Sequence, residues 1–187
     1  MLQRCTWVPI EDQLYIEYHD KEWGVPVYDD RMLFEFLILE GFQAGLSWRT
    51  ILYKRENFRK AFDYFDPAKI ANYKEEKISE LLQNEGIIRN QLKVRGAVQN
   101  ACCFLNIQKE FGTFKDYIWQ FTGGKPIKHN FHSLSEIPAT SEISDLMSKD
   151  LKKRGFKFVG STVCYSHMQA TGMVNDHTTN CFRYNQV

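Results

Sequence analysis

Apolar residues recur at helical spacing through most of the chain, and short polar or turn-forming segments separate the helical stretches. Near the N-terminus, Asp29 or Asp30 can cap a helix that ends near Gly41, and its apolar face consists of Leu33, Phe36, Leu37 and Leu39. Ser47 can cap a second helix over residues 48–62. Both stretches are therefore predicted to be amphipathic helices.

The same pattern continues along the rest of the chain. Asp66 precedes a proline that suits the first helical position, which predicts short helices over residues 67–72 and 75–84. Further helices are predicted over residues 91–111, over residues 113–121 and from Ser141 or Ser144 onward. Residues 122–141 are polar and turn-rich, and no run of alternating apolar and polar residues predicts a strand. The predicted fold class is all-α.

A single domain accounts for a chain of 187 residues, which can bury a sizeable apolar core. The N-terminus lacks the apolar core of a signal peptide, and the longest strongly apolar run, near residues 33–39, is too short to span a bilayer. The five cysteines include an adjacent pair, which favours reduced thiols over disulfides. These features predict a cytoplasmic protein that does not bind a membrane.

The net charge of the chain is only +1, but the charges are unevenly distributed. Residues 1–85 carry 11 Lys and Arg against 16 Asp and Glu, whereas residues 86–187 carry 13 against 7. A polyanion such as nucleic acid is therefore expected to contact mainly the C-terminal half. Random scatter of charge is the alternative explanation.

The stretch from Leu151 onward combines cations with glycines. A short loop bounded by Gly155 and Gly160 is surrounded by four cations, namely Lys152, Lys153, Arg154 and Lys157. Ser161 and the helical spacing after it predict a helix start, where free backbone N–H groups and the positive end of the helix dipole favour a phosphate. The pattern indicates a helix–hairpin–helix element over about residues 146–172, which holds a nucleic-acid backbone without reading bases. An ordinary helical corner with a solvated basic face is the alternative.

Candidate metal ligands lie near the two ends of the chain. His177 and Cys181 are four residues apart, and Cys5 and His19 form a second pair. A set of two cysteines and two histidines suits a tetrahedral Zn²⁺ ion, and four protein ligands leave no open position, so we expect a structural zinc. The ion would clamp residues 5–19 to residues 177–181. Taken singly, His19 is more simply an ordinary histidine and Cys5 a small buried residue.

Several aromatic residues are concentrated in the first quarter of the chain, namely Trp7, Tyr15, Tyr18, Trp23 and Trp48. Flat rings can stack on a flat, π-rich ligand, and their electron-rich faces favour a cationic one. Glu40 is the unusual carboxylate, because it follows an apolar helix face directly before Gly41. It is either solvated at a helix end or buried to accept hydrogen bonds, and the rings either line a pocket or belong to the ordinary core.

Short motifs in a fixed order extend from about residue 4 to residue 181. They are Cys5-x-Trp7, Tyr15-x-x-Tyr18-His19-Asp20, Glu22-Trp23-Gly24, Leu39-Glu40-Gly41, Gln43-Ala-Gly-Leu-Ser-Trp48, Lys54-Arg55-Glu56, Gly86-Ile-Ile-Arg89, Leu134-Ser-Glu-Ile-Pro138, Leu151–Val159, Gln169-Ala170 and Asn175-Asp176-His177. Together these motifs resemble the family of bacterial 3-methyladenine DNA glycosylases I. Their number and order make the resemblance far more specific than any single motif.

The resemblance implies a helix–hairpin–helix glycosylase fold with two helical lobes in one catalytic domain, residues 1–187, and one structural zinc. By motif position, Glu40, Trp7, Tyr18 and Trp48 match the base pocket and Trp23 lies nearby, and we add Tyr15 to this pocket because it shares a helix face with Tyr18. Glu40 is the expected catalytic residue, and two roles are open for it: accepting hydrogen bonds from the purine edge, or stabilising positive charge on the sugar and directing water. The segment from Gln43 to Leu46 matches the loop that fills the gap left in the duplex. The residues that match the backbone-holding hairpin are Gly155, Lys157, Gly160 and Ser161. Phe42 departs from the family pattern, in which a polar residue is common beside this loop.

The activity implied by the resemblance is hydrolysis of the N-glycosidic bond of 3-methyladenine in double-stranded alkylated DNA, after base flipping, by a monomeric enzyme. Because no lysine is placed as an obvious Schiff-base nucleophile, no strand cleavage is expected. Two other classes remain open from the residues. One is a non-enzymatic helix–hairpin–helix DNA-binding protein, and the other is a zinc hydrolase with Asp176 or Glu22 as the base, which needs an open metal position.

Overall fold

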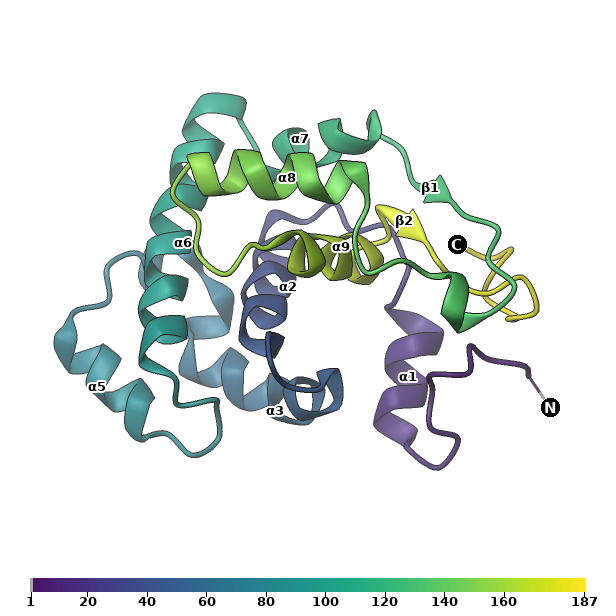
Figure 1. Cartoon of the computed structure of the whole chain (residues 1–187). Helices are drawn as coiled ribbons and strands as arrows, with labels where there is room; N and C mark the ends of the chain where they lie inside the picture. The colour runs from purple at the N-terminus through teal and green to yellow at the C-terminus, as the bar shows by residue number, and fades with distance from the viewer. Residues whose placement is uncertain (1) are drawn as a thin grey trace.

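The computed structural model describes residues 2–187, and this part of the chain is mostly helical (Figure 1). The α-helices are α1 (Gln13–Lys21), α2 (Asp30–Gln43), α3 (Trp48–Ala61), α4 (Pro67–Ile70), α5 (Glu75–Gln83), α6 (Gln91–Phe111), α7 (Phe114–Ile118), α8 (Glu142–Lys153) and α9 (Ser161–Ala170). Short 3₁₀ helices lie at η1 (Asp63–Phe65), η2 (Trp119–Thr122) and η3 (Leu134–Glu136). The helices predicted from residue 29 onward are therefore present in the predicted order, and their ends differ from the prediction by a few residues.

Side chains that the sequence marks as caps begin several of these helices. The Asp29 carboxylate accepts a hydrogen bond from the Met32 N–H, and Ser47 accepts one from the Thr50 N–H. At the start of α8, Ser141 and Ser144 each accept a hydrogen bond from the other's backbone N–H and so form a reciprocal capping box. Because a cap satisfies N–H groups that have no partner inside the helix, these local signals fix where each helix begins.

Helix α2 continues past Gly41, where the sequence pattern predicts its end. A Cβ atom at Gly41 would lie 3.3 Å from the Cβ of Phe158 and 3.5 Å from its carbonyl oxygen. The glycine therefore admits the segment that follows α8 rather than ending the helix, and α2 runs on to Gln43. A glycine needed for close packing and a glycine that stops a helix look alike in sequence.

Two short strands were not predicted. Ile127 and Lys128 form β1, and Val174 and Asn175 form β2, and the two strands pair in parallel. Two residues are too few to show an alternating pattern, and the partners are more than 40 positions apart, so only the tertiary fold brings them together.

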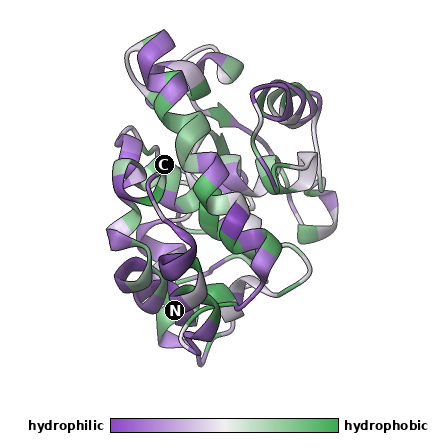
Figure 2. Ribbon diagram, turned by 90° about the vertical axis from the view of Figure 1, so that its left-hand side faces the viewer, coloured by the Kyte–Doolittle hydropathy of each residue, from purple (hydrophilic) through white to green (hydrophobic). Residues whose placement is uncertain are grey.

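Helix α2 lies at the centre of the molecule (Figure 1), and every residue from Leu33 to Phe42 is buried. It contacts α3, α6 and α9, so apolar residues are required on all its sides rather than on the single predicted face. In Figure 2 the central helices are accordingly the most hydrophobic, and hydrophilic residues predominate towards the outside. The ring Nε2 of His167 in α9 donates to the Leu33 carbonyl at 3.1 Å, which ties these two helices together.

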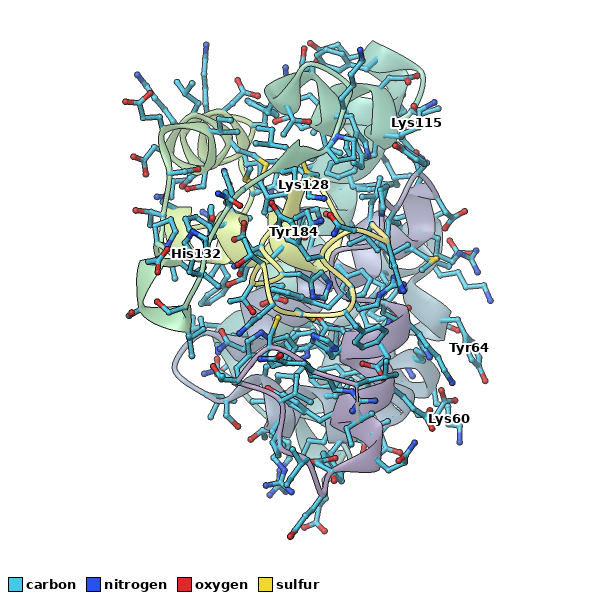
Figure 3. The ribbon with its side chains drawn as sticks, turned by 90° about the vertical axis from the view of Figure 1, so that its right-hand side faces the viewer. Lys60, Tyr64, Lys115, Lys128, His132 and Tyr184 are labelled. Atoms are coloured by element: carbon cyan, nitrogen blue, oxygen red, sulfur yellow. The ribbon has the colours of Figure 1, made fainter. Side chains whose placement is uncertain are left out.

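The N-terminal segment lies beside the C-terminal segment. Arg4 pairs with Asp20 at 2.6 Å, and the Phe182 N–H donates to the Gln3 carbonyl at 2.8 Å. On the same side of the molecule, Lys128 lies over the ring of Tyr184 at 4.0 Å, and both are labelled in Figure 3. The N-terminal segment at Gln3 and the C-terminal segment at Phe182 therefore lie side by side.

Among residues 2–187, no helix combines the length and the apolar character that crossing a membrane requires.

Candidate active site

A cavity of about 330 Å³ opens between α1, the C-terminal end of α2 and α9. All five aromatic residues predicted for the base pocket line it, namely Trp7, Tyr15, Tyr18, Trp23 and Trp48. Glu40 and Gln43 line it as well. The cavity therefore gathers side chains that are spread over more than 40 positions of the sequence.

The rings pack on one another at steep or tilted angles rather than face to face. Trp7 lies 5.5 Å from Tyr15 and 4.9 Å from Trp23 between ring centroids, with interplanar angles of 78° and 72°. Tyr18 lies 5.3 Å from Trp48. Helix α1 supplies both tyrosines from one face, because residues three apart are neighbours on a helix surface. The arrangement suits a flat aromatic ligand.

Glu40 is buried, with only 4% of its surface exposed, and it lies on the cavity wall. Burial without a compensating positive charge raises the pKa of its carboxyl group to about 8. Burial, followed by the charge of Glu40, also raises the pKa of Tyr18 well above its ordinary value. Burial alone accounts for this pKa shift, with no contribution from a hydrogen bond or a charge of the described residues, so the carboxyl group on the cavity wall is available to a ligand. A positively charged ligand is favoured here, because it would replace the solvation that the carboxylate has lost.

One wall of the cavity was missed by the sequence reasoning. Helix α9 contributes Thr162, Tyr165, Ser166 and Gln169, and the connection before α8 contributes Leu134, Ile137, Pro138 and Ala139. Some of these positions belong to the motifs of the resemblance, but no local chemical signal marks them as pocket residues.

Asp176 lies behind that wall and binds two of its side chains. It is fully buried, and its carboxylate accepts hydrogen bonds from the Tyr165 hydroxyl at 2.7 Å and from the Gln169 side chain at 2.8 Å. Its other oxygen lies 2.6 Å from Nδ1 of His129. Asp176 does not line the cavity and supports two residues that do. Both of its oxygens are thus engaged, one oxygen of Glu22 accepts a hydrogen bond from Arg55 at 2.6 Å, and neither carboxylate lines the cavity.

The four predicted metal ligands meet in one buried cluster. The ligand atoms of Cys5, His19, His177 and Cys181 all lie within 4.8 Å of one another. Cys181 Sγ is 3.5 Å from His19 Nε2 and 3.5 Å from His177 Nδ1, and Cys5 Sγ is 3.5 Å from the same Nδ1. A tetrahedral zinc with bonds of about 2.0–2.3 Å would separate its ligand atoms by about 3.6 Å. The three pairs at 3.5 Å match this separation, so the donor set and its spacing suit such an ion.

The remaining ring nitrogens of the two histidines are directed away from the cluster centre. Nδ1 of His19 lies 2.7 Å from Asp20 Oδ1, and Nε2 of His177 donates to the Trp23 carbonyl at 3.0 Å. Metal-bound histidines commonly make such bonds to a carboxylate or carbonyl, which fix the ring orientation.

The cluster also touches the cavity wall. The rings of Trp7 and His19 are 5.3 Å apart, and those of Trp23 and His177 are 4.7 Å apart. Two tryptophans of the cavity are thus supported directly by candidate metal ligands.

Two loops carry the predicted DNA-contacting residues. The insertion loop (residues 43–46) begins at the last residue of α2, and its Leu46 is 41% exposed. The Gln43 side chain donates to the Leu46 carbonyl at 3.1 Å and so closes the loop. Phe42 points away from this loop into the core, where it packs on Phe58 and Phe62.

The hairpin turn (residues 154–160) joins α8 to α9. Gly155 has a φ of +95°, which favours glycine, and Gly160 is the N-cap of α9 without a side-chain capping bond. Lys157 is exposed, and the Ser161 hydroxyl lies 2.8 Å from that of Ser144. Arg154 is engaged by Glu110 and Asp150, so it is not a free cation of this surface.

The chain belongs to the methyladenine glycosylase family, whose sequence model matches residues 7–184. It is 50% identical over 183 residues to "DNA-3-methyladenine glycosylase 1" of Escherichia coli (strain K12), covering 98% of this chain and 97% of that protein.

Solved structures agree with this assignment. A crystal structure of 3-methyladenine DNA glycosylase I matches with a TM-score of 0.94 at 53% identity, covering 96% of this chain and 98% of that one. A tyrosine-to-phenylalanine variant of such an enzyme, in complex with 3-methyladenine, matches with a TM-score of 0.92 at 34% identity, covering 96% of both chains.

Proposed function

We propose that this protein is a monofunctional DNA-3-methyladenine glycosylase of base excision repair, which hydrolyses the N-glycosidic bond of 3-methyladenine in double-stranded alkylated DNA. The observation that carries the proposal is the aromatic cavity with a buried, unpaired carboxylate, Glu40. Family membership and the named activities of close relatives support it. A helix–hairpin–helix DNA-binding protein without activity needs no such cavity.

Selection of the lesion follows from charge and shape. Methylation at N3 leaves adenine in DNA cationic, so the base stacks well on Trp7, Tyr18 or Trp48 and attracts the Glu40 carboxylate. Neutral adenine gains less from the same groups. Because the cationic base already has a weak glycosidic bond, stabilising its departure requires little further chemical assistance.

The base reaches the cavity only after it leaves the helical stack of the DNA, and unstacking and unpairing it costs about a few kcal/mol. Leu46 at the tip of the insertion loop is exposed and apolar, so it suits the gap that the base vacates. Gly155, Lys157, Gly160 and Ser161 would hold backbone phosphates at the N-terminal end of α9, as a helix–hairpin–helix element does. Gln43 binds the Leu46 carbonyl within the insertion loop, and it also lines the cavity.

The reaction itself is a hydrolysis. Water adds to the sugar carbon as the bond to N3-methyladenine breaks, the electron pair of that bond neutralises the base, and the water proton is lost to solvent or to Glu40. The DNA strand stays intact, because no lysine serves as a nucleophile. When bound, a zinc ion at Cys5, His19, His177 and Cys181 supplies no chemistry to this step and orders the two ends of the chain. The whole chain acts as one catalytic domain and as a monomer.

The test is release of free bases from DNA treated with a methylating agent. The wild-type protein is expected to release 3-methyladenine and to leave strands that break only after alkali treatment. Glu40→Gln is expected to lower the rate of release about 100-fold or more, because the neutral amide no longer attracts the cationic base. The matched control is Glu56→Gln, an exposed glutamate on α3, which keeps the wild-type rate. Full release by Glu40→Gln would remove Glu40 from the mechanism.

A further inference from the structure

Two polar side chains on one face of α6 bind the backbone of both loops that are proposed to contact DNA. The Lys93 ammonium donates to the carbonyls of Phe42 at 2.8 Å and Ala44 at 2.6 Å, where α2 passes into the insertion loop. The Asn100 side chain donates to the Lys157 carbonyl at 3.0 Å and accepts from the Lys157 N–H at 2.7 Å, in the hairpin turn. Lys93 and Asn100 are seven residues apart, which is about two helical turns, so they share one face of α6.

Both side chains are buried, with 8% of Lys93 and 4% of Asn100 exposed. Burying an ammonium group is costly unless its hydrogen bonds are satisfied, so Lys93 is held where the α2 carbonyls meet it. Helix α2 has no basic residue in its own last turn. The charge that suits the negative end of its dipole therefore comes from α6.

Phe158 shows that the hairpin turn is seated tightly on the same face. Its φ is +56°, in the left-handed region that a residue with a side chain rarely adopts. Its ring packs against Gly96 of α6, where a Cβ would lie 3.0 Å from two ring atoms, and its Cβ packs against Gly41 of α2. Phe158 thus packs against two glycines although its backbone is strained, which indicates that contacts with α2 and α6 hold the hairpin turn in this conformation.

We propose that Lys93 and Asn100 are positioning residues that set the spacing between the insertion loop and the hairpin turn, so that one duplex can engage both. The inference rests on the proposed function, since it assigns these loops to DNA. A rigid spacing matters because insertion into the stack and binding of the phosphates must occur on the same stretch of backbone. Neither side chain lines the base cavity, so they act on the duplex and not on the free base.

The experiment separates binding of the base from binding of the duplex. Affinity for free 3-methyladenine is measured by quenching of tryptophan fluorescence, and affinity for a duplex with a tetrahydrofuran abasic-site analogue by anisotropy. Excision from methylated duplex DNA is measured under single-turnover conditions. Lys93→Met and Asn100→Ala are expected to lower excision about 10- to 100-fold and to weaken binding of the abasic duplex, with free-base affinity unchanged.

The matched controls are Lys109→Met and Asn106→Ala, which change exposed side chains of the same helix and are expected to behave as wild type. Thermal unfolding of every variant is recorded, and assays run well below the melting temperature. If either primary variant does not fold, Lys93→Arg and Asn100→Asp replace it. The first keeps the charge in a different geometry, and the second turns an oxygen towards the Lys157 carbonyl, so both are expected to weaken duplex binding.

The proposal would be overturned if Lys93→Met and Asn100→Ala both keep the excision rate and the duplex affinity of the wild type. It would also be overturned if their affinity for free 3-methyladenine falls as much as their affinity for the duplex, because that indicates general damage to the fold. A wild-type protein that releases no 3-methyladenine would instead contradict the proposed function. The abasic-duplex measurement does not depend on the chemistry, so it still tests the positioning role in that case.

Discussion

Glu40 illustrates at the scale of one residue how an energetic cost can serve a function. Its pKa is raised to about 8 because burial disfavours the ionised form. Near pH 7, Glu40 is therefore neutral in most molecules of the ligand-free protein. A cationic base in the cavity favours the ionised form and draws the pKa down again. Binding of the lesion and ionisation of Glu40 are therefore coupled, and neutral adenine lacks this coupling.

This coupling predicts a pH dependence. The fraction of ionised Glu40 in the free protein increases as pH rises towards about 8, so kcat/KM for excision is expected to rise by up to about tenfold per pH unit below that value and then to level off. Single-turnover excision at low DNA concentration between pH 6 and 9 measures the profile. Glu40→Gln has no group to ionise, so its residual activity is expected to lack the rise. A wild-type profile that is flat from pH 6 to 8 would contradict the role of the carboxylate.

At the scale of elements, α9 has two separate surfaces. Its first turn and the hairpin turn before it form the proposed phosphate site, while Tyr165 and Gln169 further along form a wall of the base cavity. One short helix thus links backbone binding to base binding. Asp176 at the end of β2 fixes the second surface through both side chains.

The phosphate site predicts a defined effect of salt. Lys157→Ala is expected to weaken binding of duplexes of any sequence and to reduce the slope of log affinity against log salt by about 1, because one fewer counterion is released. Anisotropy titrations of the abasic duplex at several salt concentrations give the slope. Lys60→Ala removes an equal charge from an exposed position in the last turn of α3 and should leave the slope as in wild type. An unchanged slope for Lys157→Ala would exclude a phosphate contact by this lysine.

At the scale of the whole molecule, the cysteine and histidine cluster joins the two ends of the chain and supports the cavity. Cys5 and His19 precede Trp7 and Trp23 closely in sequence. The ring of Trp7 contacts that of His19, and the ring of Trp23 contacts that of His177. A metal ion bound by the four side chains would therefore hold two cavity tryptophans as well as the termini. The proposed zinc is structural in this sense, because a full set of protein ligands leaves no position for water.

Removal of the metal is expected to destabilise the fold and to abolish binding of free 3-methyladenine together. With free zinc 1,000-fold above its dissociation constant, the loss in free energy of unfolding is about 4 kcal/mol. Urea unfolding with and without a chelator measures it, and atomic absorption gives the metal content. Cys181→Ala should show the same loss, whereas Cys102→Ser, outside the cluster, should not. A protein that carries no zinc and is indifferent to chelation would contradict this role.

Much of the fold and of the site could be predicted from local chemistry. Asp29, Ser47 and Ser141 begin their helices because a capping side chain acts within three residues of itself. The cavity aromatics and the metal candidates were identifiable because Trp, Cys and His are scarce and their grouping near the termini is visible in the sequence. The sequence could not distinguish a buried Glu40 from a solvated one, since that depends on what covers the end of α2.

The sequence by itself determined the helical class, the starts of the helices, the family and the set of residues available for chemistry, because these follow from local hydrogen bonds, spacing and residue type. Only the tertiary structure decided that α9 completes the cavity, that β1 and β2 pair, and that Lys93 and Asn100 hold two loops from one helix. The physical reason is that these contacts join residues that are far apart in the chain, where burial and the geometry of packing act and sequence spacing carries no signal.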